Sequence, residues 1–518
     1  MSALENVELT SQPNGAAAEA AGRIAVENPA TGQIIGYVDD TPADRVAAEV
    51  ERARKAQPGW EALGFEGRAR KLKDLRTWLV ENRKRVIDTL VAEGGKTRED
   101  ALLADLWYAC DSLGFWGRKA PKFLADERVK TRSPFLLGKR IFVRYRPMGV
   151  VGVIGPWNYP LTNTFGDAIP ALAAGNTVVM KPSEITPLTN LLLVEGVEAV
   201  GFPPGVLSVV TGAGETGAAL VDNVDMIMFT GSTRTGKKVL ARAAERLTPV
   251  SLELGGKDPL IVLSDADLER AANMAVQWSM SNSGQICMAI ERAYVEAPVY
   301  DQFVASVVDK VRNLRQGAPG APGSVDIGAM TFPPQIEIVE RHVRDAVDKG
   351  AEVLVGGHRV EGPGRFYEPT VLTGVDHTMD VMRDETFGPV LPIMKVRDAD
   401  EAVLLANDSR YGLNSSVFTR DVAKGESIAR RLDAGNSCVN DACINYLAQD
   451  APFGGTGESG LGVRHGPQGI RKYCSQQTIL VTRFGPKREP TMFPNKRIMS
   501  RMFERLMVLM WGPRRKRR

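Results

Sequence analysis

Short apolar runs that alternate with helical stretches constrain the fold of this chain more than any other feature of its sequence. A run that is apolar at successive positions predicts a strand whose side chains are buried on both faces of the sheet. Such strands are typical of a parallel sheet covered by helices. Such a sheet predicts a doubly wound α/β domain, whose ligands bind beyond the carboxyl ends of the strands. The runs are Val150 to Ile154, Thr177 to Met180, Val206 to Val210, Met226 to Phe229 and Leu260 to Leu263.

A second α/β segment is predicted from Asp265 to about Gly469. Helical patterns cover residues 268–280 and 300–315, and strand-like runs follow at 390–395 and 415–419. At 518 residues with 43% apolar content, the chain is long enough to form two or three domains with sizeable cores.

Composition and charge exclude several classes of protein. The first 22 residues lack the basic start and apolar segment of a secretory signal, so we expect a cytoplasmic protein. Five scattered cysteines match neither a disulfide framework nor a zinc site, and we expect no metal. Residues 485–518 hold eleven Lys and Arg against two Glu, a net charge of +9, which leaves −6 for the rest of the chain. This mildly acidic body predicts no general nucleic-acid-binding surface.

Cys287 is the candidate nucleophile, because it follows the turn Gly284-Gln285 without metal-ligand neighbours in the sequence. None of the four histidines lies in a stretch typical of a catalytic site, so a Cys-His pair is a poor explanation of the thiol. Glu253 and Asn158 instead supply a carboxylate and a side-chain amide from motifs of their own. A thiol, a carboxylate and an amide together suit chemistry on a carbonyl group.

Two glycine patterns are less specific than they first appear. The pattern Gly212 to Gly217 follows an apolar run, as a dinucleotide fingerprint does, but lacks the acidic residue expected about twenty positions later. The pattern Gly231 to Lys238 resembles a phosphate loop, but Lys238 stands where a Ser or Thr would hold Mg²⁺, which disfavours an NTPase. What remains is a glycine-rich strand-to-helix turn that favours a pyrophosphate.

Seven motifs, taken together and in order, resemble the aldehyde dehydrogenase superfamily in its NAD(P)-dependent, non-acylating form. Each motif alone is weak, whereas seven in order are hard to obtain by chance. The match extends through roughly residues 25–480. The motifs are Pro156-Trp-Asn158-Tyr-Pro160, Lys181-Pro-Ser-Glu184, Phe229-Thr-Gly231-Ser232, Glu253-Leu-Gly-Gly256, Gly284-Gln-Ile-Cys287, Glu385-Thr-Phe387-Gly-Pro389 and Pro452-Phe-Gly-Gly455.

The resemblance implies an α/β fold with a Rossmann-type cofactor domain, a second α/β catalytic domain and a small β element for oligomerisation. The active site is expected between the two domains. Half-exposed strands at domain boundaries often pair with another subunit, so we expect a homodimer or homotetramer. The expected division is a disordered segment (1–22), an NAD-binding domain (23–138 and 150–258), bridging and oligomerisation strands (139–149 and 470–484), a catalytic domain (259–469) and a basic amphipathic tail (485–518).

The resemblance also implies the catalytic roles. Cys287 matches the nucleophile that attacks an aldehyde as thiolate to give a thiohemiacetal, and the site is expected to favour that anion. The amide of Asn158 and the backbone N–H of Cys287 are the implied donors to the oxyanion. Glu253 resembles the general base that activates water to hydrolyse the thioester, a role that suits a carboxylate whose pKa is raised.

The implied cofactor is NAD. Lys181 and Glu184 resemble ligands of the adenosine ribose, and a carboxylate at Glu184 would repel the 2′-phosphate of NADP. Glu385 and Phe387 resemble the residues that hold the nicotinamide ribose and ring. The remaining cofactor residues implied by the resemblance are Ile154, Gly155, Pro156, Trp157, Ser183, Gly214, Phe229, Thr230, Gly231, Ser232, Thr235, Leu254 and Gly255.

The substrate is less determined than the reaction. Relatives that act on succinic semialdehyde often carry an Arg about eight positions after the oxyanion Asn, and here Gly166 stands there with no basic residue from Tyr159 to Ile169. Because bidentate Arg is the usual way to fix a carboxylate, we expect an apolar, uncharged aldehyde. Three alternatives stay open: a succinic semialdehyde dehydrogenase, an acylating enzyme that passes the thioester to coenzyme A, and a non-catalytic binding protein. Glu253 favours water as the acyl acceptor.

The last segment of the sequence departs from the simplest family pattern. Apolar residues from Ile498 to Met510 recur at helical spacing between basic residues, and Arg514 to Arg518 follow. This combination predicts either peripheral membrane contact through residues 491–518 or packing of a Met-rich face on the enzyme or a neighbouring subunit. The longest apolar run, Leu506 to Trp511, is too short to span a bilayer.

Overall fold

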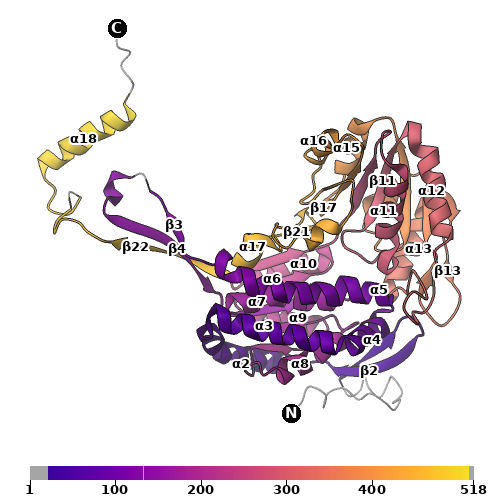
Figure 1. Cartoon of the computed structure of the whole chain (residues 1–518), viewed down its shortest axis with the longest axis horizontal. Coiled ribbons are helices and arrows are strands. Elements are labelled where there is room, and N and C mark those ends of the chain that lie inside the picture. Colours follow the sequence, from indigo (N-terminus) through magenta and orange to yellow (C-terminus); the bar gives the residue numbers. More distant parts are fainter. Residues whose placement is uncertain (1–21, 132, 490, 513–518) are drawn as a thin grey trace, which may run out of the picture. The chain divides into compact units, whose positions relative to one another are not determined.

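The computed structural model describes residues 22–131, 133–489 and 491–512, and the chain divides into two compact units (Figure 1). The larger unit comprises residues 1–124 and 147–475, and the smaller one residues 125–146 and 476–518. The predicted disordered segment 1–22 lies outside the described residues except for Gly22, and so does the basic run 514–518.

The first of two large sheets in the larger unit has the strand order β21-β9-β8-β5-β6-β7. Its strands are parallel except for the edge strand β21, which pairs antiparallel with β9. Side chains of β5, β6 and β8 are buried throughout, as expected of a sheet covered on both faces. The strands are β5 (Val150–Ile154), β6 (Thr177–Lys181), β7 (Leu207–Val209), β8 (Met226–Thr230), β9 (Val250–Glu253) and β21 (Gly460–Leu461).

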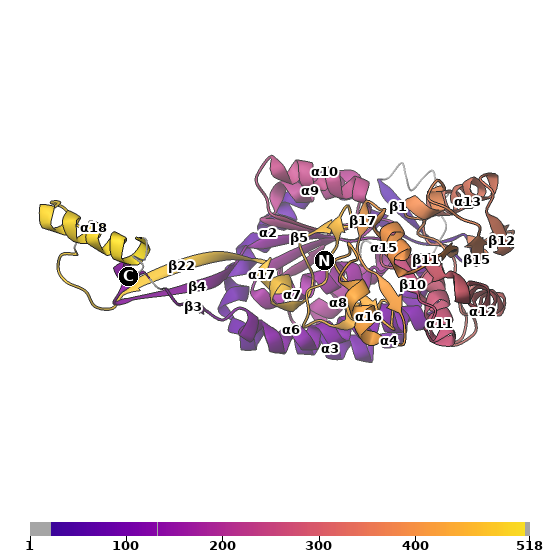
Figure 2. The same cartoon turned by 90° about the horizontal axis from the view of Figure 1, so that it is seen from above.

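Helices cover both faces of this sheet (Figure 2). In that view α9 and α10 lie on one side of the strands and α3 and α6 on the other. The helices are α2 (Ala43–Ala62), α3 (Gly64–Glu81), α4 (Arg83–Gly94), α5 (Arg98–Asp100), α6 (Tyr108–Phe123), α7 (Gly166–Ala174), α8 (Leu188–Ala199), α9 (Gly214–Asn223) and α10 (Thr233–Ala244).

The second sheet has the order β12-β15-β16-β11-β10-β18-β19, and all its pairings are parallel except β12 with β15. The expectation that the run Leu260 to Leu263 belongs to the first sheet is therefore wrong, because this run forms β10. The strands are β10 (Asp258–Val262), β11 (Ile290–Glu296), β12 (Glu352–Val355), β15 (Thr370–Thr373), β16 (Val390–Val396), β18 (Ser416–Phe418) and β19 (Cys438–Val439).

Separate apolar clusters occupy the two faces of the second sheet. One contains α11 and α12, and the other contains α13, α15 and α16. The helices are α11 (Leu268–Met280), α12 (Tyr300–Arg312), α13 (Pro333–Asp348), α14 (Asp380–Arg383), α15 (Ala399–Asn407) and α16 (Val422–Ala429), whereas α17 (Gly466–Arg471) contacts α6 and α7 of the first sheet. Short antiparallel pairs complete the larger unit: β1 (Arg23–Asn28) with β2 (Gln33–Asp39), β13 (Arg359–Val360) with β14 (Phe366–Tyr367), and β17 (Tyr411–Gly412) with β20 (Thr456–Gly457).

The smaller unit contains a three-stranded sheet in the order β22-β4-β3 and one helix. The half-exposed stretches at 140–145 and 477–482 lie in β4 (Lys139–Pro147) and β22 (Cys474–Thr482), next to β3 (Glu127–Val129). The helix is α18 (Arg497–Trp511). Within the residues that the structure describes, no helix is both long and apolar enough to cross a bilayer.

Candidate active site

Cys287 follows a tight turn at the end of α11. The turn η5 (Ser281–Gly284) ends in Gly284 at φ +70°, where an added Cβ would collide with the carbonyl of Gly388. Only glycine fits there. Cys287 as a residue is partly exposed, forms no disulfide and packs against an apolar cluster.

The electrostatic setting of the thiol differs from the sequence expectation of a favoured thiolate. Burial raises the pKa of Cys287 to about 12, the positive charge of Arg464 opposes this rise, and the carboxylates of Glu253, Asp258 and Glu385 add to it. Burial therefore favours the neutral thiol, which has to lose its proton before it attacks a carbonyl group.

Asn158 lies beside the same turn. Its buried side-chain Nδ2 donates to the backbone oxygen of Gln285 over 2.9 Å. Its own backbone oxygen accepts from Lys96 Nζ at 2.6 Å, and Lys96 is paired with Asp105 at 2.8 Å. Both of these charged side chains are fully buried. Lys96 and Asp105, which together fix the loop that carries the amide, have no signal in the local sequence pattern.

Glu253 ends β9 and is buried. A Cβ at Gly256, three residues later, would collide with the carbonyl oxygen of Cys287, so the two segments touch. Burial raises the pKa of Glu253 to about 7, with Arg464 and Lys472 opposing the rise. A raised pKa suits the general base that the family resemblance implies at Glu253, and that role stays a prediction.

A buried ion pair that the sequence analysis missed joins Arg464 to Asp167. Arg464 donates from Nε and Nη2 to the two carboxylate oxygens over 2.9 Å and 2.7 Å, a bidentate geometry. Its Nη2 also donates to the hydroxyl of Thr230, and its Nη1 lies 3.7 Å from Glu253 Oε2. Nη1 makes no hydrogen bond to any described residue. The one signal in the sequence was the lone carboxylate of Asp167 within an apolar stretch.

Aromatic rings line the cluster against which Cys287 packs. The ring of Tyr446 lies 5.0 Å from Phe453 and 5.3 Å from Tyr108. His465 lies 5.0 Å from the Tyr446 ring and accepts or donates a 2.7 Å hydrogen bond at the Tyr108 hydroxyl. Burial lowers the pKa of His465 to about 3, so this histidine is neutral. Cys287 therefore has an apolar, aromatic cluster on one side.

The residues predicted to hold the nicotinamide end meet in one place. Glu385 Oε1 accepts from the backbone N–H of Gly256 at 3.0 Å, and the Phe387 ring lies 5.3 Å from Trp157 in an edge-to-face arrangement. Burial raises the pKa of Glu385 to about 8. A side chain at Gly255 would displace the Glu385 carboxylate from its present position.

A buried ion pair between Lys257 and Glu291 stabilises the segment that carries Glu385 and Phe387. Lys257 Nζ lies 2.6 Å from Glu291, whose carboxylate accepts the backbone N–H groups of Thr386 and Phe387, both at 2.8 Å. The sequence analysis did not identify Lys257 or Glu291, because their partners are distant in the chain.

The predicted adenosine and pyrophosphate positions lie at the carboxyl ends of β5, β6 and β8. Lys181 Nζ, nearly buried, lies 3.5 Å from Glu184 Oε2. Ser232 caps α10 by accepting from the N–H of Thr235 at 3.3 Å. Ile154, Phe229 and Leu254 share one apolar cluster, and Gly155, Pro156, Ser183, Gly214 and Gly231 lie in the adjoining loops or at a helix start. The glycine turn at the start of α10 fits a pyrophosphate, and the carboxylates of Glu184 and Glu385 fit the two riboses. The rings of Trp157 and Phe387 fit the nicotinamide end.

The first glycine pattern, Gly212 to Gly217, is hydrogen-bonded to the segment after β2 and does not present its N–H groups to an anion. Asp40 Oδ1 accepts from the N–H of Ala213 at 3.3 Å and from the hydroxyl of Thr216 at 3.1 Å, next to the start of α9. Because a carboxylate already lies at this helix end, the α10 end is the better place for a pyrophosphate.

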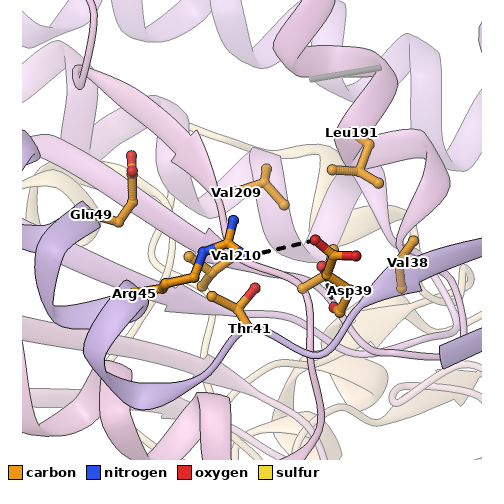
Figure 3. Close-up of a pocket in the computed structure, with 9 residues that line it drawn as sticks. Val38, Asp39, Thr41, Arg45, Glu49, Leu191, Val209 and Val210 are labelled. Carbon is orange, nitrogen blue, oxygen red and sulfur yellow. Dashed lines mark hydrogen bonds and ion pairs between the residues drawn. The ribbon is translucent and has the colours of Figure 1, made fainter. Parts of the chain in front are cut away.

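A polar pocket adjoins this segment (Figure 3). Arg45 and Asp39 face one another across it, with 3.7 Å between Nη1 and Oδ2. The pocket contains none of the predicted catalytic or cofactor residues. It is lined by Val38, Asp39, Thr41, Arg45, Glu49, Leu191, Val209, Val210 and Thr211.

Comparisons with known proteins identify the family. A protein of Methylomonas sp named 4,4'-diapolycopene aldehyde oxidase is 38% identical over 477 residues, which cover 91% of this chain and 88% of that protein. A protein of Mycobacterium ulcerans, provisionally named succinate-semialdehyde dehydrogenase (NADP(+)) 2, is 41% identical over 458 residues, covering 88% and 87%. The crystal structure of lactaldehyde dehydrogenase from Escherichia coli superposes with a TM-score of 0.85 at 36% identity, covering 89% of this chain and 96% of that one. Residues 16–479 match the model of the aldehyde dehydrogenase family, and the chain therefore belongs to this family.

Proposed function

We propose that this protein oxidises an apolar, uncharged aldehyde to its carboxylic acid with NAD, through a thioester on Cys287. The observation that carries the proposal is that the segments of Cys287, Asn158 and Glu253 contact one another beside an apolar, aromatic cluster.

The residues support each chemical stage. Cys287 gives up its thiol proton to solvent as its Sγ bonds to the aldehyde carbon. One amide N–H of Asn158 donates to Gln285, and the other, which makes no hydrogen bond to another described residue, donates to the oxyanion together with the Cys287 N–H. A bound nicotinamide supplies the acceptor for the hydride that leaves the thiohemiacetal carbon. Glu253 then takes a proton from the water that attacks the thioester, and the C–S bond breaks to release the acid.

An aldehyde panel tests the substrate proposal. A Cβ at Gly166 would meet the Tyr108 ring at 3.0 Å, so a tyrosine fills the space that an Arg at position 166 would need. We expect kcat/KM to rise from butanal to decanal, since each additional buried CH₂ contributes about 0.8 kcal/mol to binding. Reduced nicotinamide absorbance follows each reaction, and a large preference for succinic semialdehyde over decanal would refute the proposal.

A semialdehyde substrate is the second candidate, and two observations favour it. The Nη1 group of Arg464 makes no hydrogen bond to a described residue and could meet a carboxylate. The Mycobacterium ulcerans relative carries a succinate-semialdehyde dehydrogenase name. The same panel, run with and without coenzyme A, separates this candidate and an acylating enzyme from the main proposal.

The proposed preference for NAD is supported by the Glu184 carboxylate next to Lys181. We expect Glu184→Ser to shift the ratio of kcat/KM for NAD over NADP toward NADP by about tenfold, equivalent to about 1.4 kcal/mol. The reason is loss of repulsion on a 2′-phosphate while Lys181 stays. Glu198→Ser, an exposed position on α8, is the control. An unchanged ratio in Glu184→Ser would show that another group reads the ribose.

Assembly and location are proposals of the same kind. β22 and β3 are exposed edges of the small sheet, which supports a homo-oligomer, a dimer or tetramer, formed by strand pairing. All five cysteines are free, which supports a reducing compartment such as the cytoplasm.

A further inference from the structure

The helix α18 presents two apolar rows with different surroundings. Met499, Phe503 and Leu506 are half-buried, and the Phe503 ring lies 5.5 Å from the ring of Phe135 in the same unit. This row packs on its own unit. The sequence alone left packing and membrane contact as alternatives for the whole helix, whereas the structure assigns packing to one row only.

The second apolar row is exposed. Ile498, Met502 and Leu509 lie four and seven positions apart, on one side of the helix. They are 72%, 44% and 83% exposed, and Trp511 at the end of the helix is 74% exposed. Large apolar side chains gathered on one face of a helix are typical of an interaction surface.

Arginines flank the exposed row. Arg497, Arg501 and Arg505 are spaced by four residues and so form a row along the helix. None of them makes an ion pair with another described residue, and Glu504 is the one acidic residue of α18. An Arg side chain can cover apolar surface with its stem while its guanidinium binds a phosphate.

We propose that α18 docks the protein on an anionic lipid bilayer, with the row Ile498, Met502 and Leu509 in the acyl boundary and the arginine row on lipid phosphates. An apolar strip beside a cationic strip is complementary to a surface that presents acyl chains beneath negative headgroups. At 15 residues the helix lies in the plane of the surface rather than across it. Each cation strengthens binding to such a surface roughly fivefold.

Sedimentation of the full chain with vesicles tests the proposal. We expect binding to vesicles of phosphatidylcholine with phosphatidylglycerol and none to phosphatidylcholine alone. The triple variant Arg497→Glu, Arg501→Glu and Arg505→Glu should lower the bound fraction at least tenfold, and so should Ile498→Ser, Met502→Ser and Leu509→Ser. The control is Val347→Ser, Leu404→Ser and Val422→Ser, at exposed helical positions of the larger unit, which should bind as the unchanged chain does.

Two outcomes would overturn docking on a bilayer. One is failure of the unchanged chain to bind the anionic vesicles, and the other is retention of binding by the charge-reversed variant. Self-association is measured by sedimentation velocity without lipid. If the unchanged chain self-associates but binds no vesicles, and the apolar triple variant no longer self-associates, the occupant of the exposed row is a second copy of the chain. Activity on a water-soluble aldehyde is measured for every variant, so a failure of docking is distinguished from a failure of the proposed reaction.

Discussion

Replacing Cys287 by serine or alanine lowers kcat/KM for every aldehyde by roughly 10⁴-fold or more, if the thioester route is correct. A serine hydroxyl is far less acidic than a thiol and gives an ester rather than a thioester, while alanine offers no nucleophile at all. A 10⁴-fold loss corresponds to about 5 kcal/mol of transition-state stabilisation. The measurement is the initial rate of absorbance by reduced nicotinamide, with intact-protein mass to detect any acyl adduct.

The matched control for this prediction is Cys110→Ser. Cys110 is partly exposed on α6 and lies outside the candidate site, so its replacement should leave turnover unchanged. Both variants should still bind the oxidised dinucleotide, as measured by the quenching of tryptophan fluorescence. Normal turnover in Cys287→Ser with normal dinucleotide binding would remove the thioester from the mechanism.

The parallel strands were predictable, and candidate catalytic residues could be proposed, because both signals are local. Runs such as Val150 to Ile154 are apolar at every position, and the structure buries every one of these side chains. The same property hides which sheet a strand joins, so the run at Leu260 was placed in the wrong sheet. β9 was missed because its four residues include Ser251 and Glu253, and two polar side chains break an apolar run.

The ionic framework of the site was not predictable from local pattern. Asp167 and Arg464 are 297 positions apart, and Lys257 and Glu291 are 34 apart. Charges are ordinarily solvated, and nothing in a linear sequence states which ones the fold removes from water. A lone charge inside an apolar stretch, as at Asp167, does signal a buried partner, because an unpaired buried charge is costly. The signal predicts that a partner exists without identifying it.

Replacing Glu253 by glutamine should leave formation of the thioester intact and slow its hydrolysis. Without a base for the hydrolytic water, acyl-enzyme accumulates, so reduced nicotinamide appears in a single-turnover burst followed by a steady state slower by roughly 10² to 10⁴-fold. Mass spectrometry should find the acyl group on Cys287. Added hydroxylamine should restore turnover by attacking the thioester directly. A variant that shows no burst, yet binds dinucleotide normally, would place the role of Glu253 before the thioester, in accepting the thiol proton.

The pH dependence of turnover connects this base to the buried ion pair. Burial raises the pKa of Glu253 to about 7, so the ionised base is lost as pH falls, and kcat should fall on the acid side of about pH 7. Arg464 lowers that pKa, so the Arg464→Gln variant should move the ascending limb to higher pH. The double variant Asp167→Asn with Arg464→Gln keeps the buried site neutral and separates this shift from unfolding. Asp167 raises the same pKa, so an unmoved acid-side limb is decisive only in a folded Arg464→Gln single variant, where it would assign the titration to a group other than Glu253.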